Sequence, residues 1–246
     1  MKIEGKVAVV SGGGSGIGRA AVLALVERGA KVVVADIAPD AGRQTVDLAA
    51  EQGGAAVFIR CDVTKTDDLA GAFSGAVERF GQLDIAFNNA GISGEDLFAD
   101  DPGDWARIID IDLTAVIEAT RLAVREMKRT GQGGVIINTA SLIGLWPMPS
   151  APVYAAAKAG VVNFSRSLAY LAEELNIRVN TICPELVDTP MALALGEENL
   201  KELRKTGGIL RPEDIAAGVV ELIEDDSRAG AVMSITTRVG QEYVTA

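Results

Sequence analysis

Short apolar runs alternate with longer amphipathic stretches along the chain. The runs are rich in valine, isoleucine and alanine and end at glycine or polar residues, a pattern that predicts β-strands. We expect these strands at residues 6–10, 31–36, 55–61, 83–88, 134–140, 177–183 and 231–235. Between them, apolar residues at three-and-four spacing predict helices at residues 19–28, 40–52, 65–80, 102–129, 152–175 and 212–224.

Strands that are apolar throughout and separated by helices are typical of a parallel sheet covered by helices on both faces. The pattern therefore predicts an α/β fold with a doubly wound parallel sheet. No linker, repeat or change of composition divides residues 1–246, so we expect a single domain. Residues 189–211 depart from the alternation with two short helical pieces and several glycines, a composition typical of a mobile substrate lid.

The composition excludes several classes of function. The chain has 23 lysines and arginines against 34 acidic residues, and the net charge of −11 argues against nucleic acid or anionic membranes as partners. It has no histidine, which excludes a Ser-His-Asp triad, a Cys-His pair and an HExxH zinc site, and we expect no metal. Any general acid or base must then be tyrosine, lysine, aspartate, glutamate or cysteine.

The sequence also predicts a cytoplasmic location. Cys61 and Cys183 lie in apolar, strand-like runs, as expected of two reduced, buried thiols. No apolar stretch reaches the length of about 18 residues that a membrane-spanning helix needs. The first strand follows the N-terminus so closely that we expect no cleavable signal.

A glycine-rich turn links the first strand to the first helix. Gly12, Gly16 and Gly18 allow a tight turn and let the backbone approach a diphosphate, which the free N–H groups of the helix N-terminus attract. Asp36 ends the second strand, where a carboxylate accepts the ribose hydroxyls of adenosine. Ile37 and Ala38 supply no arginine for a 2′-phosphate, so the sequence predicts NAD rather than NADP. The alternative for Asp36 is an ordinary strand-end acid that caps the next helix.

Two further segments follow strands of the same predicted sheet. Asp62 follows the third strand, in a place that suits the adenine amino group. Residues 88–91, with the sequence NNAG, close the fourth strand at the same edge. The side-chain amides of Asn88 and Asn89 either contact the ligand or tie neighbouring loops together.

Tyr154 and Lys158 lie four residues apart on a predicted helix and so share a face. A free phenol, with a pKa of about 10, is a poor base at neutral pH. A nearby ammonium group lowers the pKa of a phenol. Ser141, at the end of the fifth strand, can hold a substrate oxygen beside that phenol. A Tyr-x-x-x-Lys pair is common on helices and gains weight here only through Ser141 and the nucleotide-binding turn.

With SGGGSGIG, Asp36, NNAG, Ser141 and YAAAK, the chain resembles the classical short-chain dehydrogenases/reductases from about residue 6 to residue 239. The resemblance implies a Rossmann-type sheet of about seven strands, a nicotinamide cofactor and a homotetramer built on the long helices. It implies tyrosine as acid and base, lysine as phenol tuner and ribose ligand, serine as substrate positioner, and Thr189 as a contact of the nicotinamide amide. The expected cofactor residues are Gly12, Ser15, Gly16, Ile17, Gly18, Asp36, Ile37, Asp62, Val63, Asn89, Ala90, Gly91, Tyr154, Lys158, Pro184, Val187 and Thr189.

Two positions depart from the family pattern. Asp112 stands where the family has a catalytic asparagine, so we expect catalytic residues Ser141, Tyr154, Lys158 and Asp112, or a local helix-kink role for Asp112. An ionised aspartate cannot donate a hydrogen bond as an amide does, so the proton relay to Lys158 would run through a backbone carbonyl and water. Glu185 stands where the family usually has glycine, and it either binds a polar substrate group or turns toward solvent.

Apolar residues after Ser141 and in the lid suggest the substrate pocket, although core or subunit packing claims some of them. The expected substrate residues are Ser141, Ile143, Trp146, Met148, Tyr154, Glu185 and Met191. An apolar wall suits a hydrophobic or cyclic secondary alcohol, interconverted with its ketone by an NAD-dependent oxidoreductase. The alternatives are a carbonyl reductase in the physiological direction, a non-catalytic NAD-binding regulator, and a lyase or epimerase that uses NAD transiently.

Overall fold

A computed structural model describes residues 1–93, 97 and 105–244 of the chain. Its strands form one sheet in the order β3-β2-β1-β4-β5-β6-β7-β8. The strands are Val7–Ser11 (β1), Lys31–Asp36 (β2), Ala55–Arg60 (β3), Ile85–Asn88 (β4), Gly134–Thr139 (β5), Ile177–Pro184 (β6), Val232–Thr236 (β7) and Gly240–Tyr243 (β8).

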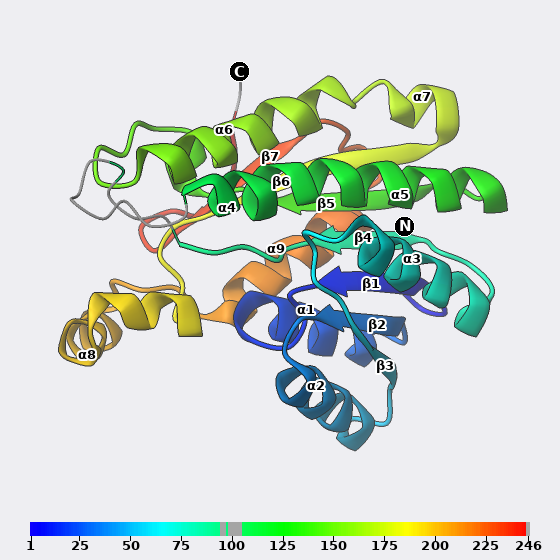
Figure 1. Ribbon diagram of the computed structural model, residues 1–246, viewed down its shortest axis with the longest axis horizontal. Coiled ribbons are helices and arrows are strands. Elements are labelled where there is room, and N and C mark those ends of the chain that lie inside the picture. Colours follow the sequence, from blue (N-terminus) through cyan, green and yellow to red (C-terminus); the bar gives the residue numbers. More distant parts are fainter. Residues whose placement is uncertain (94–96, 98–104, 245–246) are drawn as a thin grey trace.

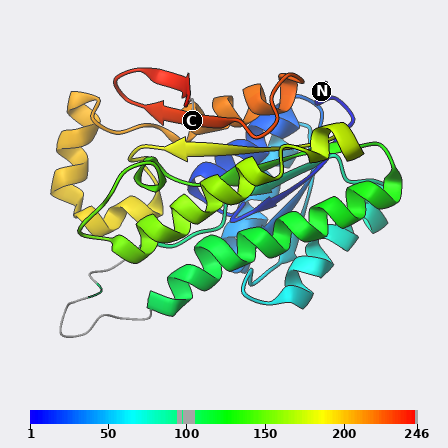
Figure 2. The same ribbon diagram turned by 90° about the horizontal axis from the view of Figure 1, so that it is seen from above.

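Helices cover both faces of this sheet (Figures 1 and 2). The α-helices are Gly16–Glu27 (α1), Pro39–Glu51 (α2), Thr66–Phe80 (α3), Trp105–Ile109 (α4), Ala115–Thr130 (α5), Pro152–Ser167 (α6), Leu171–Leu175 (α7), Glu197–Thr206 (α8) and Pro212–Glu224 (α9). A π-helical turn spans Asp110–Thr114 (η1), and 3-10 turns span Leu142–Gly144 (η2) and Pro190–Leu195 (η3).

Alternate residues along each strand supply the two layers of the core. Ala8 and Val10 belong to the cluster beneath α1 and α9, whereas Val7 and Val9 belong to the cluster beneath α3 and α5. All four side chains are almost fully buried. A strand buried on both faces has no polar side to expose, which explains the continuous apolar runs of the sequence. The predicted doubly wound α/β fold is confirmed.

Among the described residues, the sheet has eight strands rather than the predicted seven or so. The additional strand, β8, pairs antiparallel with β7 and forms the edge of the sheet beside it. Its sequence, GQEY, is polar and largely exposed, so it carries no apolar run that predicts a strand. The strand β8 forms instead because its backbone pairs with that of the buried β7.

Two of the predicted long helices are interrupted. The helix expected at residues 102–129 contains the π turn η1 before α5 begins, and its expected start at residues 102–104 lies outside the described residues. The helix expected at residues 152–175 ends as α6 at Ser167 and resumes as the short α7. Three-and-four spacing continues through both interruptions, so the apolar pattern cannot reveal them.

The carboxyl ends of the parallel strands meet at one edge of the sheet. The strand order reverses between β1 and β4, which pair with each other. From β1 the sheet continues through β2 to β3 on one side, and from β4 it continues through β5 to β8 on the other. Ligands of open α/β sheets bind in the crevice at such a reversal. The described residues include no helix long and apolar enough to cross a membrane.

Candidate active site

The turn between β1 and α1 depends on glycine at three positions. Gly12 and Gly16 have φ angles of +65° and +49°, which side-chain-bearing residues rarely adopt. A methyl group at Gly18 would overlap the carbonyl oxygen of Gly12, so the helix can begin this close to the turn only with glycine there. The turn is therefore as compact as its sequence spacing predicts.

The N-terminus of α1 opens at this turn without a side-chain cap. Ser15 is the N-cap residue, its backbone is extended, and its hydroxyl makes no capping hydrogen bond. The N–H groups of the first helical turn have no partner within the helix, and they lie at the positive end of the helix dipole. This is the donor set that a diphosphate requires, so the turn fits the diphosphate of a dinucleotide.

Asp36 holds the same turn from the end of β2. One carboxylate oxygen accepts a hydrogen bond from the Gly14 N–H at 2.8 Å, and the other accepts from the Ala38 N–H at 2.9 Å. Ala38 is the residue before α2, so the bond expected of a strand-end acid is present as well. Each oxygen keeps a second lone pair for a ribose hydroxyl. The neighbouring Ile37 is exposed.

Asp62 lies after β3 in a tight turn of its own. Its Oδ1 accepts hydrogen bonds from the Thr64 hydroxyl at 2.7 Å and from the Thr64 N–H at 3.0 Å. These bonds, the hydroxyl first, hold the pKa of Asp62 below its usual range. The carboxylate is therefore ionised at neutral pH, where both of its oxygens can accept hydrogen bonds.

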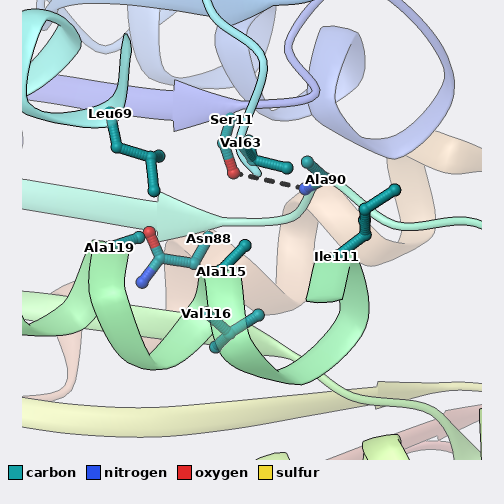
Figure 3. A pocket seen from close by; sticks show the side chains of 9 residues that line it. All are labelled: Ser11, Val63, Leu69, Asn88, Ala90, Ile111, Ala115, Val116 and Ala119. Atoms are coloured by element: carbon teal, nitrogen blue, oxygen red, sulfur yellow. Dashed lines mark hydrogen bonds between the residues drawn. The ribbon is translucent and has the colours of Figure 1, made fainter. Parts of the chain in front are cut away.

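Ser11, the last residue of β1, connects this edge to the segment after β4. Its Oγ accepts hydrogen bonds from the backbone N–H groups of Asn89 and Ala90 at 3.0 and 3.2 Å, and the bond to Ala90 is drawn in Figure 3. The Asn89 side chain donates to the Ser11 carbonyl at 3.3 Å. No sequence pattern predicts this role of Ser11, because a serine beside glycines is a common turn residue.

A small cavity lies behind the segment after β4, lined by the nine residues labelled in Figure 3, including Val63 and Asn88. Its volume is about 10 Å³, room for about one water molecule, so it is a packing gap and not a ligand site. Asn88 is buried and donates to Asn138 Oδ1 at 2.8 Å and to the Thr120 hydroxyl at 3.2 Å. Of the two roles considered for Asn88, its contacts match the tie between elements.

Lys158 is buried against the carboxyl end of β5. Its Nζ donates a hydrogen bond to the Thr139 carbonyl at 3.1 Å and lies 5.5 Å from the centre of the Tyr154 ring, one helical turn earlier on α6. Its side chain is only 3% exposed. The four-residue spacing thus brings ammonium and phenol together as predicted.

Asp112 lies in the π turn η1 and reaches the same ammonium group. Its Oδ1 is 2.9 Å from Lys158 Nζ, and its Oδ2 accepts a hydrogen bond from the Ile92 N–H at 3.4 Å. Burial raises the pKa of Asp112, and Lys158 only partly offsets that rise. Burial alone lowers the pKa of Lys158, but Asp112, followed by Tyr154, outweighs it and holds the pKa above its ordinary value. Asp112 therefore lies in an irregular helical turn and also contacts Lys158 directly.

Ser141 is the N-cap residue of η2. It is nearly buried, and its Oγ accepts a hydrogen bond from the Ile143 N–H at 3.3 Å. The hydroxyl keeps its own proton and a further lone pair for another partner. A methyl group at Gly144 would lie 2.8 Å from the Lys158 carbonyl group, so η2 packs directly on α6.

The segment after β6 starts beside the glycine turn. Pro184 and Val187 are buried, and a methyl group at Gly16 would lie 2.9 Å from the Thr189 side chain. Val187 also pairs with Leu210 in an isolated bridge, so the residues just before the expected lid at 189–211 lie beside the end of that segment. This segment contains the two short helical pieces that its sequence predicts, η3 and α8.

The expected apolar wall is exposed in the structure. Trp146 is 68% exposed and Met191 44% exposed, and Met148 is also exposed, whereas Ile143 is half-buried. These side chains come from the segment after Ser141 and from η3. They are therefore open to a ligand or a partner rather than part of the core.

A model of the short chain dehydrogenase family matches residues 6–200. The chain belongs to this family. It is 40% identical to the 15-hydroxyprostaglandin dehydrogenase [NAD(+)] of Homo sapiens, covering 100% of this chain and 97% of that protein. It is 36% identical to the cyclohexanol dehydrogenase of Acinetobacter sp., covering 92% and 90%. A solved short-chain type dehydrogenase/reductase from Mycobacterium marinum superposes with a TM-score of 0.87 at 31% identity, covering 96% of both chains.

Membership of the short chain dehydrogenase family makes the protein an oxidoreductase and confirms the resemblance that its motifs carry.

Glu185, which stands where the family usually has glycine, makes hydrogen bonds that the sequence did not suggest. One carboxylate oxygen accepts hydrogen bonds from the Thr237 N–H at 2.7 Å and from the Thr237 hydroxyl at 3.1 Å. Glu185 thus ties the end of β6 to the turn between β7 and β8. Thr237 lies 52 residues further along the chain, so no local pattern reveals this pairing.

We expect Glu185→Ala to act on stability rather than on substrate choice. The substitution removes two hydrogen bonds from a partly exposed carboxylate and should lower the free energy of unfolding by about 1 kcal/mol. Urea unfolding measures this loss, and Glu185→Gln, which keeps an acceptor oxygen, is the matched control. A fall in kcat/KM confined to alcohols that carry a second polar group would contradict the structural role and restore substrate contact.

Proposed function

We propose that the protein is an NAD-dependent oxidoreductase that interconverts a hydrophobic or cyclic secondary alcohol and the corresponding ketone. The observation that carries the proposal is the buried ammonium group of Lys158 under the ring of Tyr154, with Ser141 on the turn packed against the same helix. A phenol beside a buried cation is suited to exchanging a proton with a substrate hydroxyl.

The edge formed by β1, β2 and β4 would hold the cofactor. The N-terminus of α1 would bind the diphosphate, and Asp36 would accept the adenosine ribose hydroxyls. Asp62 and Val63 would border the adenine. Pro184, at the end of β6, and Val187 and Thr189, in the segment after it, would border the nicotinamide. Relatives named as NAD(+) enzymes support this assignment.

The remaining residues divide the chemistry between binding and proton transfer. Ser141 Oγ holds the substrate oxygen, and Tyr154 Oη takes the proton of the alcohol as the oxygen becomes a carbonyl. Lys158 stabilises the phenolate form of Tyr154 that accepts this proton. Bound at this edge, NAD supplies the acceptor for the hydride that leaves the alcohol carbon. In the direction of ketone reduction, the same phenol donates its proton.

The exposed apolar residues beside Ser141 and on η3 support a hydrophobic substrate. Relatives named cyclohexanol dehydrogenase, cis-4-hydroxycyclohexanecarboxylate dehydrogenase and 3beta-hydroxysteroid dehydrogenase 2 support a cyclic one. A screen of cyclic and open-chain secondary alcohols with NAD, followed by the absorbance of the reduced cofactor, tests the function. Cofactor binding without turnover of any alcohol would favour a regulatory NAD-binding protein.

The proposal includes a cytoplasmic homotetramer. Cys61 and Cys183 are both buried free thiols, and burial raises the pKa of each to about 12, which suits a reducing compartment. The long helices α5 and α6 would form the subunit contacts, and light scattering of the purified protein measures the assembly.

The first prediction for the proposed function concerns cofactor choice. The Asp36 carboxylate should repel a 2′-phosphate, so kcat/KM should be at least tenfold higher with NAD than with NADP. A tenfold ratio corresponds to a difference of about 1.4 kcal/mol in activation free energy. Asp36→Ala should narrow this ratio, whereas Asp47→Ala, which removes an exposed acid from the following helix α2, should not. Steady-state kinetics with both cofactors makes the comparison. Equal efficiency of the unmodified enzyme with NADP would contradict the assignment.

The second prediction concerns proton transfer. Tyr154→Phe keeps the ring over Lys158 but removes the transferable proton, so kcat should fall by about 10²-fold or more while NAD affinity persists. Tyr170→Phe is the matched control, because Tyr170 is 52% exposed in the turn between α6 and α7. Turnover and NAD binding by calorimetry are measured for both variants. Retention of most of the activity in Tyr154→Phe would assign the proton transfer to another group.

A further inference from the structure

The ammonium group of Lys158 does not face Tyr154 alone. We propose that Asp112 tunes the charge of Lys158: its carboxylate offsets part of the ammonium field at Tyr154 and moves the onset of alcohol oxidation to higher pH than a neutral side chain would give. The inference rests on the proposed function, which assigns the proton transfer to Tyr154. It makes Asp112 a positioning residue that acts through Lys158.

Geometry is the first support for the inference. Asp112 Oδ1 and Lys158 Nζ are 2.9 Å apart, and the two side chains are 0% and 3% exposed. Water and salt screen a buried pair only weakly, so the negative charge of the carboxylate also changes the electrostatic potential at groups close to the ammonium group. The Tyr154 ring, 5.5 Å from Nζ, lies within that neighbourhood.

The chemistry of the side chain is the second support. An amide at this position would leave the positive charge unopposed, whereas a carboxylate brings the charge of the pair close to zero. Burial is the largest influence on the pKa of Asp112 and raises it, whereas the ammonium group and the N–H of Ile92 lower it and so favour the ionised form. A positive charge favours a phenolate, so a partly neutralised lysine favours it less.

Few other charged groups of the described residues reach this pair. On α6, Arg166 donates a hydrogen bond to the Val244 carbonyl at 3.4 Å. The Cys183 thiol of β6 stays neutral, because burial raises its pKa to about 12. Asp110 of η1 and Arg107 of α4 are exposed, so water screens them. Asp112 is therefore the anion that sets the charge of Lys158.

The test is the pH dependence of kcat/KM for cyclohexanol with saturating NAD. In Asp112→Asn, the midpoint of the rise with pH should move down by about one pH unit relative to the unmodified enzyme. Asp84→Asn is the matched control: it neutralises another buried acid, paired with Lys6 at 3.0 Å, at the opposite end of β4. Its midpoint should stay in place. An unmoved or raised midpoint in Asp112→Asn would overturn the inference.

A second measurement does not depend on turnover. The near-ultraviolet absorbance of tyrosinate, titrated in each protein and in its Tyr154→Phe counterpart, gives the phenolate of Tyr154 by difference. This phenolate should form at lower pH in Asp112→Asn. If the phenolate forms at lower pH but no alcohol is turned over, the inference is supported and the proposed function is refuted. If an alcohol is turned over but the phenolate forms at the same pH, the proposed function is supported and the inference is refuted.

Asp112→Ser provides a second neutral variant, and circular dichroism checks the fold of each variant. A native fold with the lowered midpoint in either variant supports charge tuning. Loss of the fold in both would assign Asp112 to structure and overturn the inference.

Discussion

The burial of the Lys158 ammonium group at the carboxyl edge of the sheet is the constraint on which the candidate site depends. A buried charge is tolerated only with partners, and here they are the Thr139 carbonyl and the Asp112 carboxylate. The first requires β5 to end where α6 passes over it. The second requires the turn η1, between α4 and α5, to place its own Asp112 beside α6. Three elements thus take their positions around one cation, and the ring of Tyr154 is placed with them.

The cofactor edge follows from a different requirement, that of close backbone approach. The strand order reverses between β1 and β4, and ligands of open α/β sheets bind beyond the carboxyl ends of the strands at such a reversal. Glycine lets the turn after β1 fold tightly enough for α1 to begin there, and Ser11 fastens the segment after β4 to this turn. Lys158 lies close to this segment, because a methyl group at Gly91 would lie 3.5 Å from its Nζ. The two halves of the candidate site therefore share a boundary.

Features that arise from neighbouring residues could be predicted from the sequence, and those that arise from distant pairs could not. Apolar runs predicted the parallel strands, and four-residue spacing predicted that Tyr154 and Lys158 meet. The polar strand β8 exists because β7 offers it an edge, and the contact of Glu185 with Thr237 joins residues that only the finished sheet brings together. The apolar pattern does not predict the π turn η1, and only the departure of Asp112 from the family pattern suggested a local kink there. Its apolar residues keep helical spacing, and its irregularity shows only in the backbone hydrogen bonds.

The charge pair at the centre of the site is difficult to explain by stability alone. Replacing a buried ion pair with uncharged groups is often neutral or stabilising, because the cost of removing two charges from water can exceed their attraction. An asparagine at position 112 would avoid half of that cost and could still accept a hydrogen bond from the lysine. What the aspartate adds, and the amide cannot, is a negative charge 2.9 Å from the cation that faces the phenol. The effect specific to Asp112 would therefore be electrostatic, acting on the proton that Tyr154 exchanges in the proposed function.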